Sequence, residues 1–269
     1  MPLEPEIRIM GAKVRVLQGR KKLLDLPIEQ LIDTVYGECE RACRFEIRPQ
    51  NARIWEVRGN ATAAAFELPP HARTVRWLAD DSKAPYGPKA SYHNYYVSFP
   101  YIVLLVVFRD GGLTGQQQLY YRTESLDSGE ELQLPNLFNV AKGYKQRCWV
   151  CLKQLRDLSG ADWPTKISEI IDHVFSAAFN RSSEVHEGNS YWTRQQSIDP
   201  RVATMKAWEE ASRKDRRMGL TVPWESAGTT ASAELRKMLD TVVRAKRIRS
   251  SADLAALISS GSQMSWLPE

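Results

Sequence analysis

The chain has 269 residues, of which 43% are hydrophobic and 26% are charged, and its formal net charge at pH 7 is +5. These proportions are typical of a globular protein and exclude a chain dominated by disorder. The longest apolar run, residues 101–108, is far shorter than the roughly 20 residues that span a bilayer. The acidic, proline-bearing N-terminus is unlike a secretory signal, so we expect a cytoplasmic protein.

The positive charge is concentrated near the C-terminus. Residues 201–249 contain twelve lysines and arginines against six acidic residues, so this stretch carries the whole excess. Such a stretch favours an acidic partner, nucleic acid included, although a solvated basic face has the same composition. The length fits one core of about 150 residues with additions. We predict a domain over residues 1–180 and a helical, basic C-terminal extension over residues 181–269.

Hydrophobic periodicity predicts a helix followed by an antiparallel meander. Apolar residues three and four positions apart indicate an amphipathic helix over residues 28–43. Alternating patterns then predict strands, with a loop at 80–93 and an interruption of the most apolar strand near Pro100. The predicted strands span residues 44–48, 53–57, 74–78, 95–108 and 118–122. Short connections favour antiparallel pairing, so we predict an α+β fold in which a meander is flanked by helices.

Helices are predicted again in the second half of the chain. An apolar stripe over residues 167–179 indicates a strong helix, with Asp162 or Thr165 as its cap. Further helices are predicted at residues 201–218, 231–249 and 251–259. Large aromatic residues in the polar segments 188–192 and 222–224 suit a partner contact or attachment of the extension to the core, and we favour attachment.

Three short motifs follow the meander in a fixed order. They are Leu134-Pro135-Asn136, Cys151-Leu152 and Trp163-Pro164-Thr165. A meander followed by a Pro-Asn segment, a Cys-Leu pair and a Trp-Pro helix start resembles the ubiquitin-conjugating enzymes.

The chain is more similar to the divergent prokaryotic members of that family, the group that includes PRTRC-system protein B. The matching segments are Pro135 to Val140, Val150-Cys151-Leu152 and Ala177-Ala178-Phe179. Leu134 stands where the eukaryotic enzymes have histidine, which the prokaryotic group also lacks, and Lys153 stands where an aspartate would follow Cys-Leu.

This resemblance implies a transferase that carries a ubiquitin-like protein as a thioester on Cys151. The cysteine thiolate would attack an activated carboxyl terminus. An amide from Asn136 or Asn139 would stabilise the tetrahedral oxyanion. The implied partners are the ubiquitin-like protein, an adenylating activating protein and often a metallo-isopeptidase, in a bacterial conjugation, defence or plasmid system. We predict no cofactor and no metal ion.

Other interpretations of the same residues stay open. Cys151 between two apolar neighbours also fits a small buried hydrophobe. Together, Cys39, Cys43, Cys148 and Cys151 would supply four thiolates for zinc, although the first two fall on the apolar face of the predicted helix. The same fold could serve as a catalytically inactive scaffold for partner proteins. It could also bind nucleic acid through its basic C-terminal helices.

The four histidines give weaker signals. We expect His71 and His93 to lie in loops and His173 to lie on a helix surface. His186 falls among polar residues and glutamates, which fits a solvated loop better than a metal or partner site.

Overall fold

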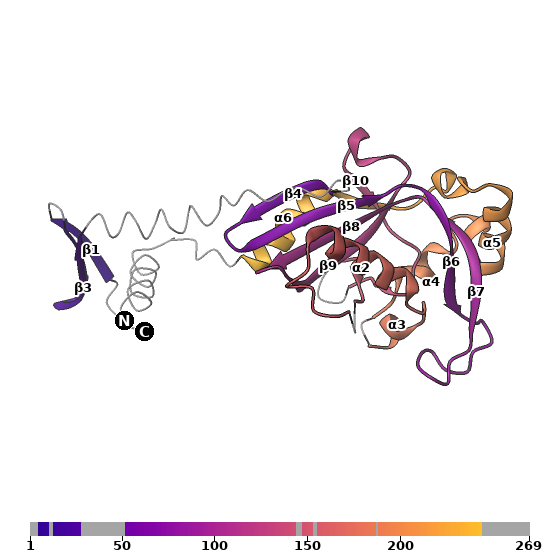
Figure 1. The fold of residues 1–269 in the computed structure, drawn as a ribbon, viewed down its shortest axis with the longest axis horizontal. Coiled ribbons are helices and arrows are strands. Elements are labelled where there is room, and N and C mark those ends of the chain that lie inside the picture. Colours follow the sequence, from indigo (N-terminus) through magenta and orange to yellow (C-terminus); the bar gives the residue numbers. More distant parts are fainter. Residues whose placement is uncertain are drawn as a thin grey trace. The chain divides into compact units, whose positions relative to one another are not determined.

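The computed structural model describes residues 5–10, 13–27, 52–143, 147–152, 155–186 and 188–243. The chain divides into two compact units. Strands β1–β3 belong to the first unit, and the residues from Ala61 to Val242 belong to the second. The fold is α+β, with a mostly antiparallel, curled sheet and few helices (Figure 1). None of the helices in the described ranges is long and apolar enough to cross a bilayer.

The first unit contains a three-stranded antiparallel meander that was not predicted. Its strands are β1 (Pro5–Met10), β2 (Lys13–Gln18) and β3 (Lys21–Pro27). Val14 and Val16 on β2 are fully buried, and Arg15 forms an ion pair with Asp25 across the β2–β3 ladder at 3.0 Å. The period-two alternation of β2 is present in the sequence, but it covers only six residues, so the pattern is weak.

The second unit contains the main sheet, with strand order β11-β12-β9-β8-β5-β4 and β10 pairing with both β9 and β13. Its strands are β4 (Ala52–Arg58), β5 (Ala61–Leu68), β8 (Tyr101–Arg109), β9 (Gly112–Arg122), β10 (Glu131–Gln133), β11 (Val140–Ala141), β12 (Trp149–Val150) and β13 (Ser226–Thr230). The predicted strands at 53–57, 95–108 and 118–122 are confirmed. Strand β5 was not predicted, because its alanine-rich sequence shows no clear alternation and Thr62 is its single β-branched residue.

Strands β6 (His71–Leu78) and β7 (Tyr92–Phe99) continue β5 and β8 beyond a proline kink as a two-stranded arm. Leu68 faces Ile102 before the kink and His71 faces Phe99 after it, so the register is unchanged across the break. Proline has no backbone N–H, so Pro69, Pro70 and Pro100 interrupt the ladder without shifting it. The predicted interruption near Pro100 is confirmed, whereas His71 and His93 lie in strands and not in loops as predicted.

The α-helices of the second unit all come after β12 in the chain, and β13 lies between α5 and α6. They are α2 (Trp163–Ser176), α3 (Ser182–His186), α4 (Tyr191–Gln195), α5 (Met205–Lys214) and α6 (Ala231–Val242), with 3-10 turns η1 (Leu126–Ser128), η2 (Pro200–Val202) and η3 (Met218–Thr221). Asp162 caps α2 as predicted, by accepting the Thr165 N–H at 2.8 Å. The helix predicted at 201–218 is shorter than expected, because Asp199 and Thr204 cap two separate elements, η2 and α5.

Helices cover both faces of the sheet. Figure 1 shows α2 crossing the near face, while α6 lies on the far side against β5 and β8. Every residue of β8 from Ile102 to Phe108 is buried, as expected for a strand with both faces covered. The alanines of β5 are also fully buried, and their small side chains let α6 approach the sheet closely. Helices α3–α6 lie in the segment assigned to a C-terminal extension, and they belong to the same compact unit as the sheet.

An aromatic core joins the arm to the segment after α2. Trp77 on β6 is 1% exposed, and its ring centroid lies 5.1 Å from Phe179 and 4.8 Å from both Phe138 and Trp192. Trp224 is also buried, and it donates to the Gly219 carbonyl at 2.8 Å. The aromatic residues of segments 188–192 and 222–224 thus attach the later part of the chain to the core, as predicted.

Both edges of the arm are occupied. On the β6 side, Leu78 and Arg76 exchange backbone hydrogen bonds of 2.8 Å with Phe179. On the β7 side, α5 supplies side chains instead of a strand. Glu209 accepts the Tyr96 N–H at 2.9 Å, and the Ser212 hydroxyl oxygen accepts the Ser98 N–H at 2.8 Å. These contacts satisfy backbone groups that an open edge strand would leave unpaired.

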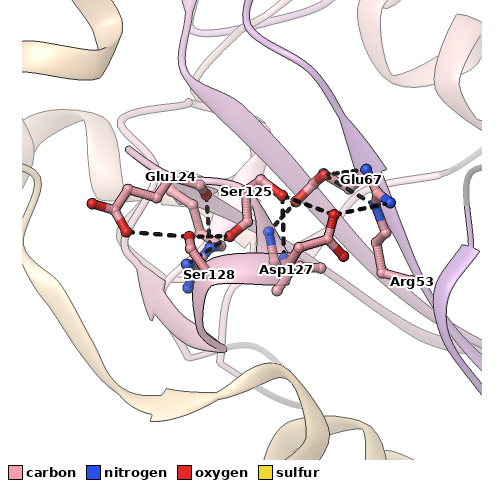
Figure 2. Close-up of polar contacts among 8 residues, drawn as sticks. Arg53, Glu67, Glu124, Ser125, Asp127 and Ser128 are labelled. Carbon is pink, nitrogen blue, oxygen red and sulfur yellow. Dashed lines mark hydrogen bonds and ion pairs between the residues drawn. The ribbon is translucent and has the colours of Figure 1, made fainter.

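A buried carboxylate anchors the loop between β9 and β10 (Figure 2). Glu67 on β5 has a side chain that is 2% exposed; it pairs with Arg53 on β4 at 3.0 Å and accepts the Leu126 N–H. Arg53 also reaches Asp127 at 3.3 Å. Arg122 at the end of β9 donates to the backbone carbonyls of Glu124, Ser125 and Glu131. The loop is therefore fixed at both ends, and β10 returns beside β9.

The kink contains a histidine whose titration should affect stability. Nδ1–H of His71 donates to the Pro69 carbonyl at 2.8 Å, and the ring packs between Phe99 and Phe175. Its Nε2 is buried without a hydrogen-bond partner within the described residues. Burial lowers the pKa of His71 below its ordinary value of 6.5, and the Pro69 hydrogen bond opposes only part of that shift.

We expect the protein to lose stability as the pH falls below about 6.5. In that range the unfolded chain binds a proton more readily than the folded chain, so stability is greatest above pH 6.5 and declines toward the lower folded-state pKa of His71. Urea midpoints measured across this window should vary less in a His71→Gln variant than in the wild type. A His93→Gln variant serves as the control because His93 is exposed, and an equal pH dependence in all three proteins would contradict the prediction.

Candidate functional site

The predicted cysteine site lies at the edge of the main sheet, where β11 and β12 pair. Val140 faces Val150 in this short antiparallel ladder. The next hydrogen bond runs from the Cys151 N–H to the Asn139 carbonyl at 3.1 Å. The structure thus brings together two of the three predicted site residues, although twelve positions separate them in the chain.

Strand β12 is held from the β9 side. Trp149 faces Gln118 in the ladder, and its indole N–H donates to the Gly115 carbonyl at 3.1 Å. The Gln117 side chain donates to the Val150 carbonyl at 3.2 Å. These contacts fix the backbone of β12, and they therefore also fix the position of Cys151. This cysteine directly follows the strand and is half-buried.

Asn139 uses its side chain to hold the turn after α2. Its Oδ1 accepts the Asn180 N–H at 3.2 Å, and its Nδ2 donates to the Ala178 carbonyl at 3.4 Å. The second of these bonds is long, near the limit of an effective hydrogen bond. Asn139 therefore lies next to Cys151 through its backbone, while its amide faces the 178–180 turn.

Asn136 is fully buried, with 0% of its surface exposed. Its neighbours from Leu134 to Phe138 are buried as well, in a segment without regular structure. Within the part of the chain that the structure describes, neither Oδ1 nor Nδ2 of Asn136 has a hydrogen-bond partner. A buried amide in this state is costly, at roughly 1–3 kcal/mol for each unsatisfied group. Asn136 is thus placed inside the fold and not on the surface beside Cys151.

Cys148 occupies a different environment from Cys151. It is fully buried, at a positive φ of 53°, within the turn that precedes β12. Burial raises the pKa of the Cys148 thiol to about 12, and the neighbouring hydroxyls of Tyr191 and Tyr120 oppose this shift only in part. A thiol in this state is not ionised near neutral pH, so it is a poor nucleophile. Sequence reasoning missed the two tyrosines because they come from α4 and β9, far along the chain.

Two of the four cysteines of the zinc interpretation, Cys148 and Cys151, lie in the described residues. Cys148 and Cys151 are both thiols that form no disulfide. No group of three or more histidine, cysteine or carboxylate side chains that could hold a metal ion occurs among the described residues. Cys39 and Cys43 lie outside the described residues, as do the predicted helix at 28–43, the strand at 44–48 and the helix at 251–259.

The Trp-Pro motif begins α2 against the sheet. The Trp163 ring packs edge-on against Trp55, with centroids 4.7 Å apart, and against Phe108 at 5.0 Å. Nζ of Lys166, one turn later, lies 4.6 Å from the centre of the Trp163 ring and donates to the Ser159 carbonyl at 3.4 Å. The motif thus fixes the start of the helix whose far end is held by Asn139.

Comparisons with protein-family models, with curated protein sequences and with solved structures gave no match for this chain.

Proposed function

We propose that the second unit is a ubiquitin-conjugating-enzyme-like domain that carries a ubiquitin-like protein as a thioester on Cys151. The observation that carries this proposal is the position of Cys151, half-buried at the end of β12 and bonded through its backbone to Asn139. The order of meander, Pro-Asn segment, Cys-Leu and Trp-Pro helix supports it. The partners would be a ubiquitin-like protein and an adenylating activating protein, in a bacterial conjugation, defence or plasmid system.

In the proposed reaction, the Cys151 thiolate attacks the carbonyl carbon of an activated C-terminus. A new carbon–sulfur bond forms, the activating group leaves, and an amine later takes the acyl group. The oxyanion needs a donor, and we take Asn139 Nδ2 as the candidate because Asn139 bonds to Cys151 through its backbone and its amide would give up only a bond of 3.4 Å. The buried Asn136 would have a structural role and would help to position the segment that leads to Asn139.

The test is acyl transfer from ubiquitin whose C-terminal carboxyl is activated as a mercaptoethanesulfonate thioester. We expect an adduct on Cys151 that dithiothreitol removes, with release of mercaptoethanesulfonate. Cys151→Ala should abolish the adduct, whereas Cys148→Ala should retain it, and both proteins should give the circular dichroism spectrum of the wild type. An adduct that survives Cys151→Ala, or that maps to Cys148, would rule out this assignment.

A second candidate is a scaffold of the same fold without catalysis, which binds partner proteins. The side chain of Asn139 favours it, because both ends of its amide already contact the 178–180 turn. In that case Cys151→Ser should leave the biological function of the protein unchanged.

A further inference from the structure

The β6–β7 arm has one face toward the core and one toward solvent. Alternate residues such as Val75, Trp77 and Val97 are buried in the core. The positions between them form what we call the arm face, in which Thr74 faces Tyr96, Arg76 faces Asn94 and Leu78 faces Tyr92. Thr74, Arg76 and Asn94 are exposed, and the two tyrosines are partly exposed. The arm face is therefore polar, apart from the buried Leu78 at its end.

Two arginines lie over the two tyrosines of the arm face. The guanidinium carbon of Arg76 is 4.7 Å from the centre of the Tyr92 ring, and that of Arg213 on α5 is 5.9 Å from the centre of the Tyr96 ring. Tyr92 and Tyr96 are four residues apart on one strand, which separates them by about 13 Å. The arm face thus presents two planar cationic groups on aromatic rings, at a spacing that a short extended single strand can cover.

Basic residues continue the arm face at the end of α5. Arg213, Lys214, Arg216 and Arg217 are all exposed. The turn that contains them is anchored to the arm at both ends. Ser212 accepts the Ser98 N–H, and the Cα of Gly219 lies so close to the kink that a Cβ there would be 2.8 Å from the Pro100 nitrogen.

Two of the three acidic residues on this part of α5 and the turn are already engaged, and the third is Glu210. Glu209 accepts the Tyr96 N–H and pairs with Arg213 at 3.0 Å, and Asp215 accepts the Arg217 N–H at 2.8 Å. The arm face and the adjoining turn therefore carry a net positive charge.

We propose that the arm face binds single-stranded nucleic acid, at a site distinct from Cys151. Exposed bases stack on aromatic rings and on guanidinium planes, and Arg76–Tyr92 and Arg213–Tyr96 supply both. The phosphates would lie toward the turn that contains Lys214, Arg216 and Arg217. An acidic polypeptide would match the positive charge but has no bases to stack on the two arginine–tyrosine pairs. In a duplex the bases are paired and stacked inside the helix, so they cannot reach these pairs. Single-stranded nucleic acid therefore fits the arm face best.

The experiment is fluorescence anisotropy of the full chain with a labelled oligothymidine of about 12 nucleotides, its duplex with oligodeoxyadenosine, and a polyglutamate peptide. We expect the single strand to bind most tightly and its affinity to fall steeply between about 50 mM and about 200 mM salt. Tighter binding of the duplex or of polyglutamate would overturn the proposal.

Variants distinguish the arm face from general basic charge. Arg76→Ala with Arg213→Ala should lower the affinity for the single strand at least about tenfold. Tyr92→Ala should lower it at least about fivefold, while Tyr92→Phe, which keeps the ring, should stay within about twofold. Arg156→Ala, which removes an exposed arginine on another surface, is the matched control and should also stay within about twofold. Unchanged binding in the arm-face variants, with loss on replacing the basic residues at 244–249, would overturn the proposal.

Discussion

At pH 8, native Cys148 should react with iodoacetamide about a thousandfold more slowly than an ordinary thiol. Burial raises its pKa from 9.0 to about 12, and the thiolate fraction falls about tenfold for each pH unit by which the pKa rises. The side chain is also fully shielded from the reagent. The measurement is a labelling time course on the native protein, with the modified peptides identified by mass spectrometry.

Unfolded protein in urea provides the reference rate for this experiment, because Cys148 then has no burial to raise its pKa. Cys151 provides an internal comparison three residues away, and its partial exposure should give faster labelling than Cys148 in the native state. Equal rates for Cys148 before and after unfolding would contradict the buried position of this thiol. Protection of Cys151 to the same degree would favour the scaffold over the thioester carrier.

Replacing Trp208 with alanine should lower the free energy of unfolding of the second unit by about 3–5 kcal/mol. Trp208 on α5 is fully buried, and its ring centroid lies 5.4 Å from Phe99 and 6.5 Å from Trp192. Its indole N–H also donates to the Ser98 carbonyl at 3.0 Å. The substitution therefore opens a cavity at the kink and leaves a buried carbonyl without its donor.

Urea unfolding followed by far-UV circular dichroism measures this loss. Trp208→Phe separates the two effects, because it keeps most of the packing and should cost only about 1–3 kcal/mol for the unpaired carbonyl. Lys206→Ala on the same helix is exposed and should change the unfolding free energy by less than about 0.5 kcal/mol. A loss below about 1 kcal/mol in Trp208→Ala would mean that α5 does not seal the edge of β7.

The two proposed sites lie on different parts of one unit, so they can be tested separately. Cys151 follows β12 at one edge of the main sheet, whereas the arm face lies beyond the proline kink, next to α5. The side chains of Arg76 and Tyr92 pack on each other, and the bond from Arg76 to the 178–180 turn uses its backbone carbonyl, which substitution of the side chain keeps. If the chain binds single-stranded nucleic acid but forms no thioester, the arm-face proposal stands and the thioester proposal fails. If it forms the thioester but binds no single-stranded nucleic acid, the opposite holds.

The sequence by itself determined the elements whose signals are local. Alternation and β-branched residues marked β4, β8 and β9, Pro100 marked the kink, and Asp162 with the apolar stripe marked α2. Periodicity, capping and proline chemistry act within a few residues, so the chain order alone expresses them. The order of the Pro-Asn, Cys-Leu and Trp-Pro motifs is also present in the sequence, and it led to the hypothesis that Cys151 carries a thioester.

Only the tertiary structure decided which side chains meet. It placed Asn139 beside Cys151 through the backbone and buried Asn136, although the sequence offered Asn136 as the motif match and Asn139 only as a second candidate. It also showed that Cys148 is fully buried while Cys151 is half-buried. The tyrosines beside Cys148 come from β9 and α4, so this difference in environment depends on tertiary contacts. It also brought Arg213 over Tyr96, across more than a hundred positions of chain. Contacts of this range depend on the register and packing of the whole unit, and no local pattern in the sequence encodes them.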